Sequence, residues 1–186
     1  TVQDSYDAYL WKSGLNNATL AIEAAPEIHI KNHSYGPEEP FEIGEGSERI
    51  KDILKATSEN AVVHVFSAGN ARNRDKDTKK VSCEDANKDF TITSPYVMAV
   101  AALGSDGTYS YYSSYGANVF VTAPSSSYAN YLGITTTDRT GADYGYNKYD
   151  AVKNPDGDSR DAFPNTNYTS TFGGTSSSAP LVSGIM

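Results

Sequence analysis

Three consecutive serines near the end of the sequence have the type and spacing needed for chemistry. They lie in "FGGTSSSAPLVSGIM" (172–186), a stretch without charged side chains. Gly173 and Gly174 permit a positive φ and a close approach of another group to the backbone. Pro180 is tolerated in the first turn of a helix, where backbone N–H groups have no intrahelical acceptor. We therefore expect the serines to begin a helix, whose positive pole stabilises a developing negative charge.

This position suits the nucleophile of an acyl transfer, but two other interpretations use the same residue types. A phosphate cradle also places glycines before a helix, although a P-loop carries a Lys and no cation lies between Ala162 and Met186. A plain N-cap in a polar loop needs only one Ser or Thr at the helix start. The nucleophile elbow of α/β-hydrolases does not fit, because it requires Gly two residues after Ser176, where Ser178 stands.

A side-chain amide in "SAGN" (67–70) adds a second chemical group. The preceding "AVVHVFS" (61–67) is a nearly continuous β-branched and aromatic run, as expected for a strand that is covered on both faces. An amide at the end of such a strand can donate hydrogen bonds to an oxyanion in a site that excludes water. Asn70 is thus a candidate to stabilise the charge that attack by a serine would create.

The elements that must position these groups alternate between strands and a helix. Ile50, Ile53, Leu54 and Thr57 recur at helical spacing after Ser47, the expected N-cap. Strands are expected over residues 27–32, 61–67, 97–102 and 118–124. This order predicts an α/β fold, with a doubly wound, mostly parallel sheet, helices on both faces and ligands at the carboxyl ends of the strands.

Composition limits the classes of partner. The chain has 186 residues, of which 38% are hydrophobic, and this suggests one domain. Its net charge of −8 weighs against nucleic acid or an anionic membrane as the main partner. The apolar runs are far shorter than the ~20 residues that span a bilayer, so no membrane span is expected. The single cysteine, Cys83, cannot form an internal disulfide.

Charge is distributed unevenly along the chain. Residues 90–137 hold one charged side chain, Asp106, so we expect this stretch to be packed in the interior. Residues 138–161 are rich in Asp, Gly, Asn and Tyr and lack hydrophobic periodicity. This second stretch is predicted to be a surface insertion.

The two loop motifs together resemble those of the subtilisin-like serine peptidases, the subtilases. The nucleophile motif of that family is Gly-Thr-Ser-x-Ser/Ala-x-Pro, and residues 174–180 read "GTSSSAP"; Gly69-Asn70 matches the Gly-Asn pair of its oxyanion hole. "IHIKNHSYGPEEP" (28–40) and "TTTD" (135–138) resemble the kexin and furin-like branch. The resemblance covers nearly the whole chain and implies a subtilisin-like fold and hydrolysis of peptide bonds.

The resemblance also implies roles for individual residues. Ser176 would form the acyl-enzyme, and Asn70 with the Ser176 N–H would form the oxyanion hole. Residues Ser34, Tyr35 and Gly36 would pair with the main chain of a polypeptide substrate as an added strand. The opposite wall of the pocket for the side chain before the scissile bond would consist of Ser67, Ala68 and Gly69.

Side-chain specificity is less determined. Furin-like relatives surround this pocket with acidic groups that bind Arg or Lys, and Glu38 and Glu39 stand at the matching place, with Glu39 as the expected contact. A solvated acidic loop is the alternative. Ser114 stands where those relatives carry an acidic metal ligand, so broad specificity stays open.

A serine hydroxyl needs a base, normally a His oriented by a carboxylate. In the family both precede the oxyanion Asn, but neither the His-Gly-Thr-His type of motif nor the strand-end Asp is present here. His29 and His64 lie in predicted strands, where structural roles are expected, and His33 lies in the substrate segment. We therefore expect residues 1–186 to be the later part of one catalytic domain, inactive alone and completed by a propeptide or N-terminal segment. The alternative is a catalytically degenerate subtilase fold that binds peptides.

No organic cofactor is expected, but the resemblance implies structural calcium. Asp156, Asp158 and Asp161 around Gly157 are candidate ligands, although an ordinary turn is the preferred explanation because no complete EF-hand pattern is present. The resemblance further implies a secreted protein, extracellular or on the cell surface.

Overall fold

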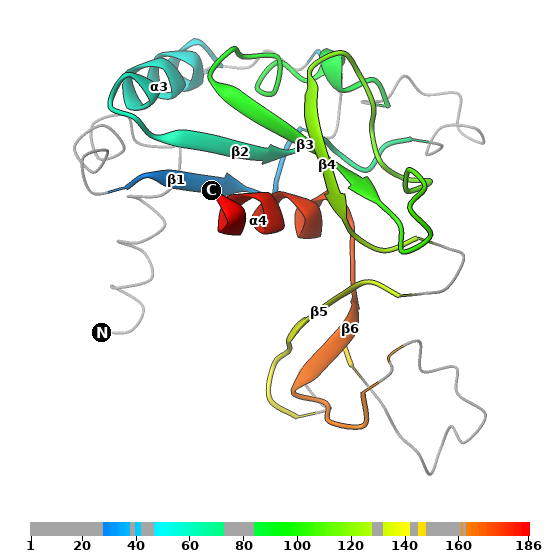
Figure 1. The fold of residues 1–186 in the computed structure, drawn as a ribbon. Coiled ribbons are helices and arrows are strands. Elements are labelled where there is room, and N and C mark those ends of the chain that lie inside the picture. Colours follow the sequence, from blue (N-terminus) through cyan, green and yellow to red (C-terminus); the bar gives the residue numbers. More distant parts are fainter. Residues whose placement is uncertain are drawn as a thin grey trace.

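The computed structural model describes residues 28–37, 40–41, 47–72, 84–127, 132–141, 145–147, 161 and 163–186. Its elements in chain order are β1 (Ile30–His33), α3 (Ser47–Glu59), β2 (Val63–Ser67), η2 (Ala86–Lys88), β3 (Val97–Leu103), β4 (Val119–Pro124), β5 (Ile134–Thr137), β6 (Tyr168–Phe172) and α4 (Thr175–Ile185). Figure 1 shows β1 to β4 as one sheet, with β5 and β6 forming a separate arm below it. The expected strands and helices are confirmed, although β1 begins at Ile30 rather than at residue 27.

The main sheet is parallel throughout, in the order β1-β2-β3-β4. Ile30 lies opposite Val63, and His64 lies opposite Val97. Because all four strands run the same way, the loops after β1, β2 and β4 leave the same edge of the sheet. The expected doubly wound, mostly parallel architecture is confirmed.

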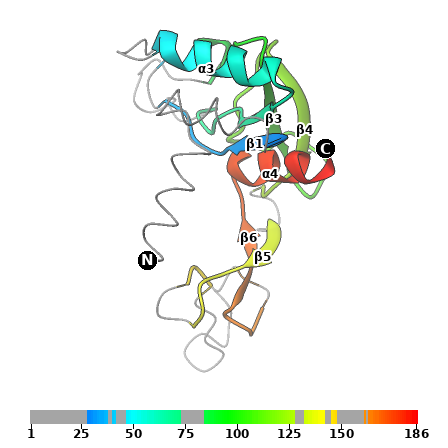
Figure 2. The same cartoon turned by 90° about the vertical axis from the view of Figure 1, so that its left-hand side faces the viewer.

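Two apolar cores cover the two faces of the sheet. Phe66 of β2 packs with Ile53 and Leu54 of α3 on one face, whereas its neighbour Val65 packs with Ala179 of α4 on the other. Figure 2 shows α3 and α4 on opposite sides of the sheet. Side chains alternate along a strand, so a continuous apolar run is what a strand between two helical layers requires.

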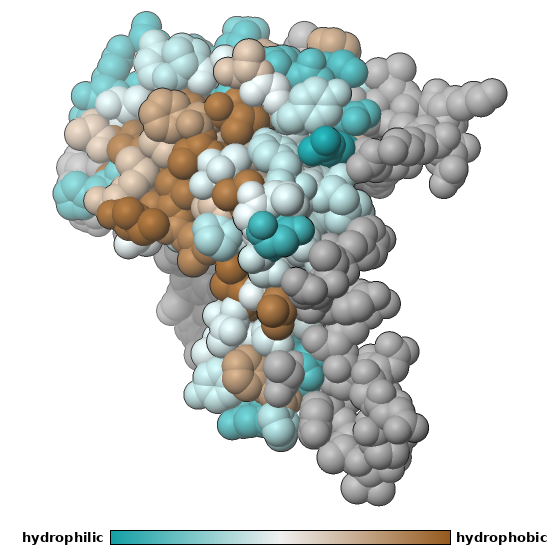
Figure 3. Space-filling view, turned by 45° about the vertical axis from the view of Figure 1, so that its right-hand side comes forward, coloured by the Kyte–Doolittle hydropathy of each residue, from teal (hydrophilic) through white to brown (hydrophobic). Residues whose placement is uncertain are grey.

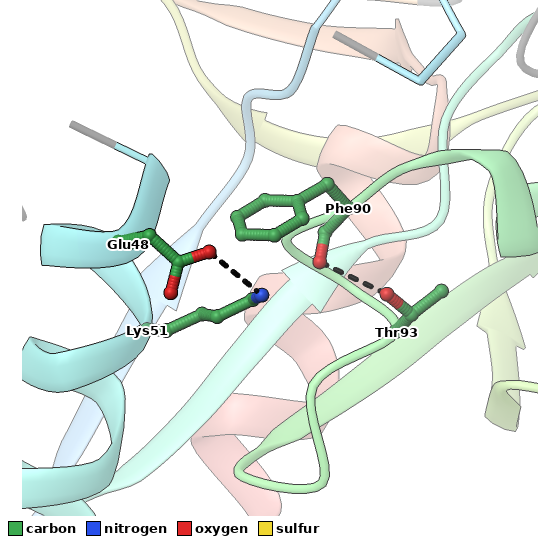
Figure 4. A network of polar contacts seen from close by, with 4 residues as sticks. All are labelled: Glu48, Lys51, Phe90 and Thr93. Atoms are coloured by element: carbon green, nitrogen blue, oxygen red, sulfur yellow. Dashed lines mark hydrogen bonds and ion pairs between the residues drawn. The ribbon is translucent and has the colours of Figure 1, made fainter. Parts of the chain in front are cut away.

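Lys51 of α3 makes polar contacts at the solvent side of the helix, in addition to the apolar contacts of the opposite face. Lys51 Nζ lies 3.2 Å from Glu48 Oε1 and 4.3 Å from the centroid of the Phe90 ring (Figure 4). Thr93 Oγ1 donates to Phe90 O at 2.9 Å and closes the turn that presents this ring. Exposed ion pairs contribute ~0–1 kcal/mol, so the position of α3 depends mainly on its buried Ile53 and Leu54.

The β5-β6 arm was not expected from the sequence. These strands pair antiparallel, and Asn147 and Asp161, which belong to the predicted surface insertion, are buried at the arm. Asn147 Nδ2 donates to Phe163 O at 2.9 Å and to Tyr168 O at 2.7 Å. The prediction of a surface insertion is therefore wrong for Asn147 and Asp161, because their polar side chains satisfy backbone groups of the arm; Tyr146 is exposed as expected.

The expectation that residues 90–137 are packed inside holds for β3 but not for β4. Residues 99–102 of β3 are buried, whereas Phe120 of β4 is 74% exposed. β4 is an edge strand of the described sheet, and no described residue buries the Phe120 side chain. Figure 3 shows a broad apolar area on the upper body of the molecule. Within the described ranges, no helix is long and apolar enough to cross a membrane.

Candidate active site

The three serines at the beginning of α4 have different surroundings. Ser177 and Ser178 are buried; Ser177 Oγ donates to Gly174 O at 2.9 Å, and Ser178 Oγ donates to Ala123 O at 3.1 Å. Ser176 is half-buried, and its hydroxyl has one long contact to the described residues, 3.4 Å to Ser34 O. Of the three serines, Ser176 is therefore the one that is partly exposed and whose hydroxyl makes no short hydrogen bond to the described residues.

A two-glycine turn places Ser176 in the first turn of α4. Gly174 is the N-cap residue, with φ of 79° and no side-chain capping hydrogen bond. A Cβ atom on Gly173 would overlap Ser126 Oγ. The expected positive φ and close approach are thus both present, one at each glycine. The Ser176 N–H lies in the turn where backbone N–H groups have no intrahelical acceptor, and it can serve an external one.

Hydrogen bonds from Thr175 determine the orientation of the Asn70 amide. Thr175 N and Thr175 Oγ1 donate to Asn70 Oδ1 at 2.8 Å and 3.0 Å, and Gly69 N donates to Thr175 Oγ1 at 3.1 Å. Because a backbone N–H can only donate, the amide atom that faces Thr175 must be the oxygen. Asn70 is exposed, and no described residue accepts a hydrogen bond from its Nδ2. The amide therefore presents two N–H donors beside the start of α4.

The segment after β1 is tied directly to α4. Ser34 Oγ donates to Ser176 O at 3.0 Å, and Ser183 Oγ donates to Asn32 Oδ1 at 3.2 Å. These bonds join residues that are far apart in the sequence and bring the segment beside the candidate nucleophile. Of the residues predicted for the site, the structure thus brings together Ser34, Gly69, Asn70 and Ser176.

Ser67 and Ala68, the other residues predicted for the pocket wall, are held by the sheet. Ser67 and Ala68 are buried at the end of β2, and Ala68 N donates to Val100 O at 2.9 Å. Ser114, which is fully buried, donates through its backbone N–H to Gly69 O at 2.9 Å. Its hydroxyl accepts from Ala71 N at 3.3 Å, so Ser114 braces the loop that carries Asn70.

Two of the three metal candidates, Asp156 and Asp158, lie outside the described residues, as does Glu39. Asp161 uses its carboxylate to anchor β6: it accepts from Ser170 N at 3.0 Å and from the hydroxyls of Thr169 and Ser170. In the part of the chain that the structure covers, no group of three or more His, Cys, Asp or Glu side chains could hold a metal ion.

A buried carboxylate that no motif singled out lies against the substrate segment. Asp89 is 7% exposed, and a Cβ atom on Gly36 would lie 3.3 Å from Asp89 Oδ2. Burial raises the pKa of Asp89, although backbone N–H groups of Thr91 and Ile92 act in the opposite direction. A carboxyl group therefore lies beneath Gly36, and its burial favours the neutral form.

Tyr112 and Ser125 support the glycine turn, and the sequence analysis missed both. Gly174 N donates to Tyr112 OH at 3.0 Å, and Tyr112 OH donates to Ser126 O at 2.8 Å. Ser125 Oγ donates to Gly174 O at 2.8 Å. The available signal was a pair of hydroxyl-rich strings, "SYYSS" and "PSSS", within a stretch that has one charged side chain.

The Tyr112 hydroxyl can be removed without changing the ring. We expect Tyr112→Phe to lower the free energy of unfolding by ~1–2 kcal/mol, because Gly174 N–H and Ser126 O lose their shared partner. Urea denaturation of the intact protein measures this loss. Tyr146→Phe is the matched control, since Tyr146 is 87% exposed, and it should change stability by less than ~0.5 kcal/mol. Equal stability of the two variants would contradict the bracing role.

His33 and His64 form a buried pair that does not contact Ser176. They are 1% and 0% exposed. His33 Nε2 lies 3.1 Å from His64 Nδ1, and His64 Nε2 lies 2.7 Å from Thr57 Oγ1. His64 is thus a satisfied core histidine, as expected from its place in a strand, whereas His29 is exposed. The described contacts give neither buried imidazole the position of a base for the serine.

The environment keeps both imidazoles neutral. Burial lowers the pKa of His33 to about 3, and the neighbouring His64 and Lys31 act in the same direction. Burial, with Lys31, lowers the pKa of His64 to about 4. Both values lie well below the ordinary 6.5 of histidine.

We expect the protein to lose stability as the pH falls from 6.5 towards 4. In this range the histidines of the unfolded state bind protons that the folded pair excludes. Because the unfolded state binds more protons, the free energy of unfolding decreases as the pH decreases. At pH 5 the loss is roughly 2 kcal/mol for each histidine. Urea denaturation at pH 7, 6 and 5 measures it.

One variant of a buried histidine and one variant of an exposed histidine test the source of this pH dependence. His64→Gln should lose one histidine's share of the pH dependence, whereas His29→Gln should retain the wild-type slope because it leaves the buried pair of His33 and His64 intact. A wild-type slope in His64→Gln would show that the buried pair is not its source.

The comparisons with known proteins agree on one family. The sequence matches the profile described as the subtilase family over residues 6–186. An extracellular serine protease of Aeromonas sobria is 34% identical over 131 residues, which cover 68% of this chain and 21% of that protein. A calcium-dependent protease of Trichormus variabilis is 33% identical over 135 residues, which cover 72% of this chain and 17% of that protein. The chain thus spans about a fifth of the length of these relatives.

Solved structures share the fold. The crystal structure of the A. sobria serine protease in complex with a chaperone superimposes with a TM-score of 0.69 at 22% identity, covering 90% of this chain and 32% of that one. A cold-adapted subtilisin-like serine proteinase gives a TM-score of 0.53 at 17% identity, covering 91% of this chain and 46% of that one. The fold is subtilisin-like, as the motifs predicted.

Proposed function

We propose, from the premise that this chain belongs to the subtilase family, that the protein is a serine endopeptidase in which Ser176 attacks the peptide carbonyl. The observation that carries this proposal is the difference between the three serines. The hydroxyls of Ser177 and Ser178 hold the fold, whereas Ser176 is accessible beside the amide of Asn70. A nucleophile next to pre-oriented donors is the arrangement that acyl transfer requires.

Asn70 and the Ser176 N–H would form the oxyanion hole. The Thr175 contacts fix Asn70 Oδ1, so the Nδ2 donors are oriented before substrate binds. Pre-oriented donors need no reorganisation when charge develops on the carbonyl oxygen, and this lowers the free energy of the transition state. Substrate main chain would add as a strand along Ser34, Tyr35 and Gly36, with Ser67, Ala68 and Gly69 opposite.

The general base would come from outside the described residues. Ser176 needs an imidazole to accept its proton, and His33 and His64 are engaged with each other. We propose that residues 1–186 form the later part of the catalytic domain, and that a propeptide or N-terminal segment carrying Asp and His completes the site. The chaperone bound to the A. sobria protease is consistent with a partner that acts on this domain.

Side-chain specificity, secretion and calcium binding are proposed from fewer observations. A preference for Arg or Lys, as in the kexin-like branch that the sequence resembles, is supported by Glu39 in the sequence. Secretion and structural calcium are proposed from the extracellular and calcium-dependent relatives. A peptide-binding module without catalysis is the second candidate, and the buried engagement of both histidines is the observation that favours it.

Product mapping distinguishes the two functions. The intact protein is incubated with peptides that differ only in one side chain before the central bond, and the products are identified by mass spectrometry. Cleavage, with acylation of Ser176 when the reaction is quenched early, supports the peptidase; preference for Arg or Lys supports the acidic pocket. Saturable binding of the same peptides without products would support the binding module and overturn the peptidase.

A further inference from the structure

We propose that His33 and His64 position the substrate-binding segment of residues 34–36 by holding the Tyr35 hydroxyl through a hydrogen-bond chain that ends on α3. This inference rests on the proposed function, which places substrate along that segment. The chain consists of Tyr35 OH, His33, His64, Thr57 Oγ1 and Ile53 O, with successive distances of 2.7, 3.1, 2.7 and 2.6 Å. The first three links join different elements, namely the segment after β1, β1 itself, β2 and α3, and the last link lies within α3.

The direction of this chain follows from its fixed end. Thr57 Oγ1 has one hydrogen, which it donates to Ile53 O in the preceding turn of α3. It can therefore only accept from His64 Nε2, so the proton of His64 is on Nε2 and its Nδ1 is an acceptor. His33 Nε2–H must then donate to His64 Nδ1. His33 Nδ1 is left as an acceptor, and Tyr35 O–H donates to it.

Ring contacts reinforce the same geometry. The His33 ring stacks on Phe66 with centroids 4.1 Å apart and an interplanar angle of 15°. The Tyr35 ring meets His33 edge-on, with centroids 5.5 Å apart, and meets Phe66 edge-on at 5.9 Å. Tyr35 is 54% exposed as a residue, yet its hydroxyl is directed into the molecule. Its ring is consequently displayed in one orientation.

The segment is fixed from both faces of the sheet. On the α4 face, Ser34 Oγ donates to Ser176 O at 3.0 Å. On the α3 face, the next residue, Tyr35, is held by His33 at 2.7 Å. Successive side chains of an extended segment point to opposite faces, so adjacent residues can serve the two attachments. An edge that must accept a substrate strand is thereby ordered before the substrate binds, which reduces the entropy lost on binding.

The test separates positioning of the segment from activation of the serine. We expect Tyr35→Phe in the intact protein to raise KM for an extended peptide about three- to tenfold, the value of one lost hydrogen bond. The rate of Ser176 labelling by a small fluorophosphonate should stay within about twofold, because that probe does not need the segment. Tyr96→Phe, before β3 and 36% exposed, is the matched control and should leave both quantities unchanged.

Substitution of His33 adds a graded comparison. His33→Leu removes both links and should raise KM at least as much as Tyr35→Phe, whereas His33→Gln can accept from Tyr35 and donate to His64, and should recover part of the loss. A Tyr35→Phe variant with unchanged KM would overturn the proposal. A rise in KM that is matched by an equal fall in the rate of Ser176 labelling would also overturn it, because the pair of effects would indicate general damage to the site.

A spectroscopic measurement tests the chain even if a variant fails to fold. Nitrogen-15 NMR of the wild-type protein at pH 7 should show His33 and His64 both as neutral Nε2–H tautomers. An Nδ1–H tautomer or a charged ring at either position would overturn the proposal. If the wild-type protein does not cleave peptides, the proposed function fails separately; the Kd of the same peptide then replaces KM, and a Kd unchanged by Tyr35→Phe would overturn this inference as well.

Discussion

Replacement of Ser176 by alanine should abolish peptide hydrolysis by the intact protein, with a loss in kcat on the order of 10⁴- to 10⁶-fold, the range known from subtilisin. The hydroxyl of Ser176 is the accessible one of the three at the start of α4, and no described contact makes it necessary for the fold. Stability should therefore change little while activity disappears. Steady-state kinetics and urea denaturation of the same preparation measure the two effects.

Ser178→Ala is the matched control for this substitution. Ser178 Oγ is buried and donates to Ala123 O at 3.1 Å and to Pro124 O at 3.2 Å. We expect its loss to reduce the free energy of unfolding by ~1–2 kcal/mol while the nucleophile stays reactive. Retention of activity in Ser176→Ala, or the reverse pattern in the two variants, would show that the nucleophile has been assigned to the wrong serine.

Replacement of Asn70 by alanine should reduce kcat by roughly 10²- to 10³-fold with KM nearly unchanged. This is the loss measured for the oxyanion-hole asparagine of subtilisin, and we expect it here because, in the proposed function, the Asn70 Nδ2 donors would serve only the transition-state charge. The acceptor Asn70 Oδ1 also holds Thr175 N at 2.8 Å, so a small loss of stability should accompany the kinetic effect.

Two further variants separate the donor from the acceptor of Asn70. Asn70→Asp keeps an oxygen for Thr175 but loses the N–H donors and adds negative charge, so its kcat should fall at least as far as that of Asn70→Ala. Thr175→Val removes the hydroxyl that donates to Asn70 Oδ1 at 3.0 Å, and should lower kcat about tenfold through a less ordered amide. An Asn70→Asp variant with wild-type kcat would exclude the oxyanion role.

The main parallel sheet and its helices could be predicted from the sequence because their apolar patterns are local. The strand over residues 61–67 and the helix from Ser47 show their periodicity within a few residues, and both are present in the structure. The β5-β6 arm escaped prediction because its strands alternate polar threonines and serines with few apolar residues, and their pairing depends on Asn147 and Asp161 from elsewhere in the chain. Such non-local partners leave no periodic signal.

The parts of the candidate site that belong to a sequence motif could be predicted. The parts that depend on packing between distant segments could not. The position of Ser176 in the motif "GTSSSAP" predicted it as the nucleophile. The physical distinction from its neighbours comes from Gly174 O and Ala123 O, which accept hydrogen bonds from the hydroxyls of Ser177 and Ser178. Tyr112, Ser125 and the His33-His64 pair act through contacts between distant segments. The roles of Glu39, Asp156 and Asp158 stay predictions, since these residues lie outside the described ranges.

The most direct test of the peptidase proposal is covalent labelling of the intact natural protein with a fluorophosphonate, followed by mapping of the modified peptide. An activated serine reacts with this probe, whereas an ordinary hydroxyl does not. We expect one modified residue, Ser176, and we expect a peptide substrate to compete with the label. A folded, intact protein that refuses the label, or that carries it on another serine, would contradict the assignment of Ser176 as the nucleophile.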